Sequence, residues 1–160
     1  MTNFRIGFGS DLHRLADDLP LIIGGVNIPH SKGCVGHSDG DALIHAICDA
    51  LLGAANLRDI GTHFPDTSDE NKNRASRYFL DNVMLMLAEA GYMLGNIDCT
   101  VNLQTPKLRD HIPAMKTFLA EVMHAEENQI SIKAKTGEHV GPVGLEQAIS
   151  VECVALIVKK

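Results

Sequence analysis

The chain has 160 residues, of which 45% are hydrophobic and 21% are charged, proportions typical of an ordinary globular protein. Its formal net charge is −6 and no basic cluster is present, which argues against a nucleic-acid partner because phosphate backbones need concentrated Lys and Arg. No apolar run approaches the roughly 18 residues of a membrane span, and the first residues lack the apolar stretch of a secretory signal. We therefore expect one domain over residues 1–160, located in the cytoplasm, with four reduced cysteines.

The first third of the chain predicts a strand, a hairpin and a helix. Residues 4–9 have strand character, and LPLIIGGVNIP predicts a hairpin that turns at its Gly-Gly pair. A helix is expected over about residues 39–55, with Ser38 as its N-cap and Asp41 completing a capping-box-like pair. Gly7 and Gly9 precede no third glycine and no dinucleotide-binding helix, so they are not a convincing nucleotide-binding fingerprint.

The remaining elements alternate between strands and helices. After a long polar loop, helices are expected over about residues 75–90 and 114–124, and strands over 95–104, 129–136 and 148–160. The strands and helices lack regular βαβ spacing, so we predict an α+β fold with a mixed four-stranded sheet, helices on one face and a small β-hairpin. The other face of the sheet then needs a cover, and a second copy of the chain is the simplest candidate.

Two histidines and an aspartate predict a metal site. Asp11 and His13 lie two apart after the first strand, so both side chains can reach one ion, and His45 on the helix can supply a third ligand. Two imidazoles and one carboxylate suit a tetrahedral Zn²⁺ with one open position. The residues alone leave a second interpretation open, in which His45 is a core histidine hydrogen-bonded to Asp41 or Asp49, one turn away on the same helix.

Several motifs together resemble one enzyme family. RIGFGSDLHRL, IPHSKGCVGHSDGDALIHAICDALLGAANLRDIGTHFPDT, GYMLGNIDCTVNLQTPK, HIPAM and KAKTGE follow one another in that family's order and spacing. The chain resembles the 2-C-methyl-D-erythritol 2,4-cyclodiphosphate synthase family from Arg5 to Lys159. The resemblance implies a small α+β domain that assembles as a homotrimer, with active sites between adjacent subunits and a small-molecule diphosphocytidyl substrate.

The resemblance also implies which residues form the site. Asp11, His13 and His45 would hold zinc, and Glu138 a second divalent ion, Mg²⁺ or Mn²⁺. His37 and Thr136 would stabilise the transition state. The implied substrate-binding set is Asp11, His13, His37, Ser38, Asp59, Ile60, Gly61, Phe64, Pro65, Asp66, Thr67, Ser68, Leu103, Gln104, Thr105, Pro106, Lys107, Leu108, Arg109, Lys135, Thr136, Gly137 and Glu138.

The implied activity is that of a phosphorus–oxygen lyase in non-mevalonate isoprenoid synthesis. The 2-phosphate of 4-diphosphocytidyl-2-C-methyl-D-erythritol 2-phosphate would attack the β-phosphorus, expel CMP and close a cyclic diphosphate. A phosphate with a second pKa of about 6 is mostly ionised near neutral pH, so a protein base is dispensable. The residues alone also allow a zinc phosphoesterase, or a metal- or isoprenoid-binding module without catalysis.

The sequence departs from the family pattern at two positions. Many members carry an arginine where Leu145 stands, at the end of the central cavity of the trimer, and leucine cannot bind a ligand there through charge. Lys135 stands in a stretch that is commonly Thr-rich, where it can add positive charge near the phosphates or remain a solvated strand residue. We further predict that Asp49 orients the His45 imidazole or forms an ordinary i,i+4 pair with it.

Overall fold

The computed structural model describes residues 3–65 and 74–160. Its main sheet has five strands in the order β4-β1-β7-β5-β6, of which β5 and β6 run parallel and the other neighbours antiparallel. A separate antiparallel pair, β2 and β3, forms the predicted hairpin. The strand bounds are Phe4–Asp17 for β1, Leu21–Ile23 for β2, Val26–Ile28 for β3, Lys32–Cys34 for β4, Tyr92–Asn102 for β5, Ile130–Lys135 for β6 and Ala148–Lys159 for β7.

The α+β class is confirmed, but the predicted number of four strands in the main sheet is wrong. The first strand extends from residue 4 to residue 17, well beyond the predicted 4–9. Its last residues, Leu15 to Asp17, pair with the three-residue strand β4, which the sequence analysis missed. A strand of three residues is too short to show the alternation of polar and apolar residues by which strands are recognised.

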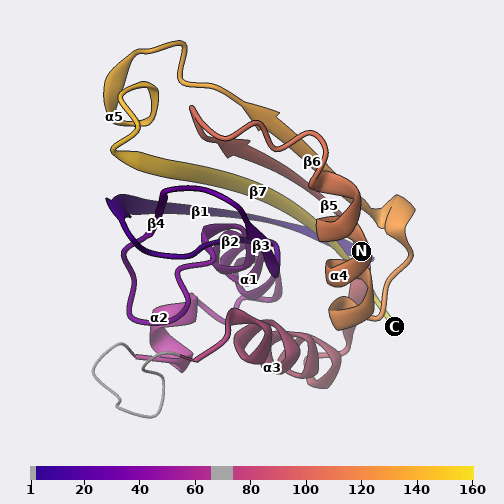
Figure 1. Cartoon of the computed structure of the whole chain (residues 1–160). Helices are drawn as coiled ribbons and strands as arrows, with labels where there is room; N and C mark the ends of the chain where they lie inside the picture. The colour runs from indigo at the N-terminus through magenta and orange to yellow at the C-terminus, as the bar shows by residue number, and fades with distance from the viewer. Residues whose placement is uncertain (1–2, 66–73) are drawn as a thin grey trace.

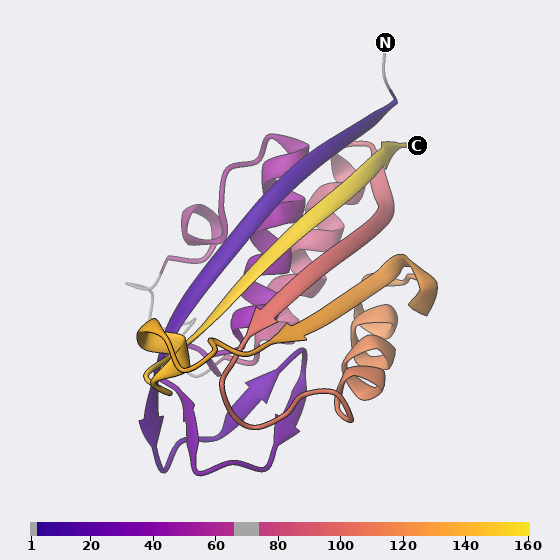
Figure 2. The same cartoon turned by 90° about the horizontal axis from the view of Figure 1, so that it is seen from above.

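The helices α1 (Ala42–Ala55), α3 (Ser76–Glu89) and α4 (Ile112–Met123) lie on one side of the main sheet, as predicted (Figure 1). Figure 2 shows the long strands β1, β7 and β5 crossing in front of α1 and α3. The remaining helical segments are short: α2 (Ile60–His63), a 3₁₀ turn η2 (Glu127–Gln129) and α5 (Gly141–Gly144). The described residues contain no helix with both the length and the apolar character needed to cross a membrane.

Helix α1 begins three residues later than predicted, because Asp41 and not Ser38 is its N-cap. The Asp41 carboxylate accepts the backbone N–H of Ile44, 3.1 Å away, which is the usual N-cap bond to the third helical residue. The same buried carboxylate accepts the N–H groups of Gly24 at 2.9 Å and Gly25 at 2.7 Å. Both glycines have positive φ, so the hairpin turn points its amides at the helix start and fixes the two segments together.

The β1 strand packs directly on α1 through two glycines. A Cβ atom on Gly9 would lie 2.1 Å from the carbonyl oxygen of Ala46, and one on Gly7 would lie 1.9 Å from that of Ala50. The alternation of the strand then turns Ile6 and Phe8 to the opposite face, where each is 62% exposed. No helix of residues 3–65 and 74–160 covers this face, which is therefore apolar at β1.

Candidate functional site

Three metal-ligand side chains meet where β1 passes the second turn of α1. Asp11 and His13 point from β1 toward His45 of α1, and one ligand atom from each lies within 4.8 Å of the other two. Asp11 Oδ2 is 2.9 Å from His13 Nδ1 and 3.2 Å from His45 Nδ1. The close approach of strand and helix at Gly9 brings these residues together, although 32 positions separate His13 from His45 in the chain.

The electrostatics of the cluster favour a carboxylate facing two imidazoles. Burial acts to raise the pKa of Asp11, but its contacts with His13 and His45 lower it further, to about 2. Burial acts to lower the pKa of His45, yet the hydrogen bond and charge of Asp11 raise it overall. Asp11 is therefore an anion at neutral pH and supplies the negative charge that a divalent cation needs.

The donor set fits a zinc ion. His13 Nδ1 is buried and makes no well-aligned hydrogen bond to any described residue, although Asp11 is close to it. An unsatisfied ring nitrogen beside a carboxylate and a second imidazole is expected where an ion, and not a proton donor, is the missing partner. Two His and one Asp also match the three protein ligands of catalytic zinc sites, which keep a fourth position open.

The cluster forms one wall of a cavity of about 380 Å³. The structure brings eight of the predicted site residues to this cavity. They are Asp11, His13, His37, Ser38, His45, Ile60, Gly61 and Phe64. Asp59 lies next to it as the N-cap of α2, where its carboxylate accepts the Thr62 N–H at 2.8 Å. Pro65 follows Phe64 directly, whereas Asp66, Thr67 and Ser68 lie outside the described residues.

Asp49 also lines this cavity, but it does not orient His45 as predicted. Its carboxylate accepts the backbone N–H of Ile60 at 2.7 Å, and no described contact shows a hydrogen bond to His45. The spacing of four residues placed both side chains on one helix face, but the neighbouring α2 supplies a closer donor than the imidazole. Asp49 therefore positions the α2 segment against the cavity.

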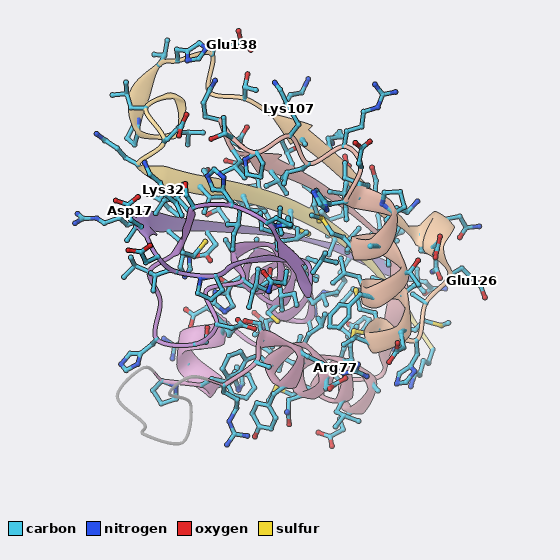
Figure 3. All side chains as sticks on the ribbon, in the orientation of Figure 1. Asp17, Lys32, Arg77, Lys107, Glu126 and Glu138 are labelled. Atoms are coloured by element: carbon cyan, nitrogen blue, oxygen red, sulfur yellow. The ribbon has the colours of Figure 1, made fainter. Side chains whose placement is uncertain are left out.

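A second group of predicted residues gathers elsewhere, at the outer edge of the sheet. Leu103, Pro106, Lys107, Leu108, Arg109, Lys135 and Thr136 line a hollow of about 130 Å³ that shares no residue with the metal cavity. Figure 3 shows Lys107 and Glu138 projecting from this edge, beside β6 and the loop before α5. The hollow carries three cationic side chains, which suits an anionic ligand in an otherwise acidic chain.

Three predicted residues, Thr136, Glu138 and Gln104, organise the loop after β6. Thr136 Oγ1 donates to the carboxylate of Glu138 at 2.6 Å, so the hydroxyl and the expected second-metal ligand lie together. The Gln104 side chain is buried and its carbonyl accepts the N–H groups of Gly137 at 3.1 Å and His139 at 3.4 Å. Gln104 therefore holds the loop through its side chain. Thr105, the remaining predicted residue, precedes a cis peptide bond to Pro106.

Sequence reasoning missed Ser76 and Phe79, which lie against His45, and the hydrogen bonds that join Asp39 to Ser76. Ser76 is fully buried at the start of α3, and its hydroxyl lies 3.0 Å from His45 Nε2. Asp39 accepts the backbone N–H of Ser76 at 2.9 Å and also its hydroxyl. Phe79 packs near the His45 ring, with 6.2 Å between ring centroids. The only available signal was the position of Ser76 at the start of a predicted helix.

Known proteins with the same combination of fold and motifs identify the family. The model of the YgbB family matches residues 4–158. The chain belongs to the YgbB family. Among curated YgbB relatives, the 2-C-methyl-D-erythritol 2,4-cyclodiphosphate synthase of Parabacteroides distasonis is 57% identical over 153 residues, which cover 96% of this chain and 95% of that protein. The synthase of the same name from Porphyromonas gingivalis W83 is 54% identical over 155 residues, or 97% and 96% of the two chains.

Solved structures agree with this assignment of the YgbB fold. The bifunctional IspDF of Campylobacter jejuni superposes with a TM-score of 0.95 at 37% identity, covering 98% of this chain and 42% of that one. A 2C-methyl-D-erythritol-2,4-cyclodiphosphate synthase in its CDP-bound form has a TM-score of 0.89 at 36% identity, covering 96% and 99%. The curated relatives and the CDP-bound structure are named as 2-C-methyl-D-erythritol 2,4-cyclodiphosphate synthases, so the predicted resemblance to that family is confirmed.

Proposed function

We propose that the chain is a metal-dependent phosphorus–oxygen lyase. It converts 4-diphosphocytidyl-2-C-methyl-D-erythritol 2-phosphate into 2-C-methyl-D-erythritol 2,4-cyclodiphosphate and CMP, in non-mevalonate isoprenoid precursor synthesis. The observation that carries this proposal is the Asp11–His13–His45 cluster in the wall of a cavity that also holds His37 and Ser38. The names of the close relatives support it, because they name 2-C-methyl-D-erythritol 2,4-cyclodiphosphate as the product.

Asp11, His13 and His45 would hold Zn²⁺, and Glu138 would contribute to a site for Mg²⁺ or Mn²⁺. When bound, such ions act as Lewis acids that neutralise the charge of the diphosphate. The fit of the zinc ligands rests on their donor types and on the unsatisfied His13 nitrogen. The Glu138 carboxylate already lies beside the Thr136 hydroxyl, so a second ion bound by Glu138 would also lie close to the oxygen of Thr136.

The protein side chains position the substrate and do not attack it. The nucleophile is the substrate's own phosphate, and an oriented intramolecular attack lowers the barrier by roughly 7–11 kcal/mol relative to a bimolecular one. His37 and Thr136 would donate hydrogen bonds to the phosphoryl oxygens where negative charge develops. Lys107 in the second hollow is suited to the cytidine end of the substrate, and Lys135 beside Thr136 adds positive charge near the phosphates.

We further propose that three copies of the chain assemble and share their active sites. The sheet face opposite the helices exposes Ile6, Phe8 and Leu12, each more than 60% exposed, and a patch of this kind marks a protein interface. The metal cavity and the second hollow share no residue, which fits a site that combines the cavity of one subunit with the hollow of its neighbour. Sedimentation of the unchanged chain should give three times the mass of one chain, and Phe8→Asp should lower the measured mass to that of a single chain.

The reaction itself is tested with purified chain, the diphosphocytidyl substrate and Mg²⁺. We expect CMP and the cyclic diphosphate in equal amounts, about one tightly bound zinc per chain, and no oxygen from ¹⁸O-labelled water in the product. Asp11→Ala and His45→Ala should each abolish zinc binding and turnover while the trimer persists. Release of CMP without cyclisation would overturn the proposed reaction, and incorporation of labelled oxygen would indicate a zinc phosphoesterase instead.

A further inference from the structure

The two ring nitrogens of His45 face chemically different partners. Nδ1 lies 3.2 Å from Asp11 Oδ2, on the side of the metal cluster. Nε2 points the other way, toward the hydroxyls of Ser76 at 3.0 Å and Ser38 at 3.2 Å. A neutral imidazole carries its proton on one nitrogen and can bind a metal only through the other. A neighbouring group that accepts a hydrogen bond from an Nε2–H therefore keeps the proton on Nε2 and leaves the Nδ1 lone pair available to an ion.

The Ser76 hydroxyl can only accept from His45, because its own proton is committed elsewhere. It donates to Asp39 Oδ1, while the Ser76 backbone N–H donates to Asp39 Oδ2 at 2.9 Å. The Asp41 backbone N–H is a further donor to Asp39 Oδ1, at 3.2 Å. Backbone amides cannot accept, so these donors hold Asp39 as an acceptor. Since a hydroxyl has one proton, Ser76 Oγ is left with a lone pair facing His45 Nε2.

Ser38 differs from Ser76 in its surroundings. Ser38 lines the cavity and is therefore open to a ligand, whereas Ser76 is fully buried and is not part of the cavity wall. The only other described hydrogen bond to the Ser38 hydroxyl is a long one, 3.4 Å, from the N–H of Gly40. Among the described residues no hydrogen bond fixes the direction of the Ser38 proton, so these contacts do not let this hydroxyl impose a tautomer on the imidazole.

We propose that Ser76 and Asp39 are positioning residues that hold His45 with its proton on Nε2 and so present Nδ1 to the metal bound by Asp11 and His13. The chain of donors runs from His45 Nε2 to Ser76 Oγ and from Ser76 Oγ to Asp39 Oδ1. Partners of this kind fix the orientation of a ligating imidazole and raise its basicity, and their loss costs roughly 10–100-fold in metal affinity. The inference rests on the metal site proposed above.

The first test measures Zn²⁺ affinity by competition with a chromophoric chelator. Ser76→Ala should bind Zn²⁺ at least about 10-fold more weakly than the unchanged chain, while the matched control Ser38→Ala should stay within about twofold. Ser76→Ala removes only the hydroxyl and keeps the backbone N–H that anchors α3 to Asp39. Asp39→Asn, which loses one of the two acceptor oxygens, should also weaken binding. Equal affinity of the Ser76 and Asp39 variants and the unchanged chain would refute the proposal, as would a larger loss in Ser38→Ala.

The second test reads the tautomer directly in the unchanged chain. In the Zn²⁺-loaded protein, ¹H–¹⁵N correlation spectra should show a slowly exchanging proton on His45 Nε2 and none on Nδ1. In Ser76→Ala the same proton should exchange at least about 10-fold faster, a change that a purely structural role of Ser76 would not cause. A proton on Nδ1 in the loaded protein would overturn the proposal without any variant. Failure of the unchanged chain to bind Zn²⁺ would instead contradict the proposed metal site.

Discussion

Replacing Gly9 by alanine should move Asp11 and His13 on β1 away from His45 on α1. Gly9 lies two residues before Asp11 on β1, and its Cα faces the backbone of α1 beside His45. An added Cβ would lie 2.1 Å from the Ala46 carbonyl oxygen and 2.6 Å from the Ala50 nitrogen. Both are backbone atoms of a helix, so no side chain can rotate away to make room, and strand and helix must move apart.

The size of the effect follows from these distances. Real Cβ atoms essentially never approach other heavy atoms closer than 3.0 Å, so β1 and α1 must separate by roughly 1 Å at this point. Metal–ligand distances tolerate only about 0.2 Å, so a separation of this size displaces His45 well beyond that range. We expect Gly9→Ala to lose at least about 3 kcal/mol of folding free energy, a fall of roughly 10 °C in Tm, and at least about 10-fold in Zn²⁺ affinity.

Gly53→Ala on the same helix is the matched control. A Cβ there meets only the Phe8 carbonyl oxygen, at 3.9 Å, and alanine is favoured over glycine in a helix by about 1 kcal/mol. This variant should unfold at the same temperature as the unchanged chain or above it, with the same Zn²⁺ affinity. Scanning calorimetry and chelator competition on both variants provide the measurements. A Gly9→Ala chain with unchanged Tm and Zn²⁺ affinity would refute the packing argument.

Three further predictions concern acidic and thiol groups near the site. Burial raises the pKa of Asp41 from its ordinary 3.8 to about 6, against the pull of its three backbone donors, so the folded state holds this proton more tightly than the unfolded chain. Stability relative to Asp41→Asn should therefore fall by about 3 kcal/mol as the pH rises from about 3 to about 7 in urea titrations. A constant difference would contradict the shift. Asp49→Ala removes the acceptor of the Ile60 N–H and should raise KM without changing zinc content. Asp49→Asn keeps an oxygen there and should raise KM less. Equal KM values for the unchanged chain and Asp49→Ala would be inconsistent with this role. Burial raises the pKa of Cys34 to about 12, and all four cysteines are buried and unpaired. A disulfide reagent at pH 8 should therefore react with these thiols only as fast as the chain unfolds. Rapid labelling of the native chain would contradict this prediction.

Much of the site was accessible from the sequence because its ligands lie on regular elements. In an extended strand, residues two apart share a face, so Asp11 and His13 were predicted to point together. The spacing of four placed Asp41, His45 and Asp49 on one face of a helix that does form. Periodicity within an element sets which way a side chain points. It does not specify what lies opposite, and the sequence alone therefore left two interpretations of His45 open.

The features that were missed depend on contacts between distant segments. Gly7 and Gly9 were set aside as an incomplete nucleotide-binding motif, whereas they are glycines because the α1 backbone leaves no space for a Cβ. Ser76 lies 31 residues after His45 and has no periodic pattern to link it to the cluster. The start of α1 was misplaced for the same reason. The Asp41 carboxylate caps the helix while it also accepts two N–H groups from a hairpin turn that lies 16 or more residues earlier in the chain.

Three polar residues spaced four apart, Asp41 at the N-cap of α1 and His45 and Asp49 within it, contact three separate segments. Asp41 accepts the amides of the β2–β3 turn, His45 faces Asp11 of β1, and Asp49 accepts the N–H of Ile60 at the start of α2. Each residue is one turn further along than the last, and each contacts a different segment of the chain. An aliphatic stripe would bury as much surface but would fix none of these segments in direction, because only hydrogen bonds and metal ligation depend on angle. The helix therefore orients the cavity as well as supporting it, so a displacement of α1 should loosen the ligands and the α2 wall together.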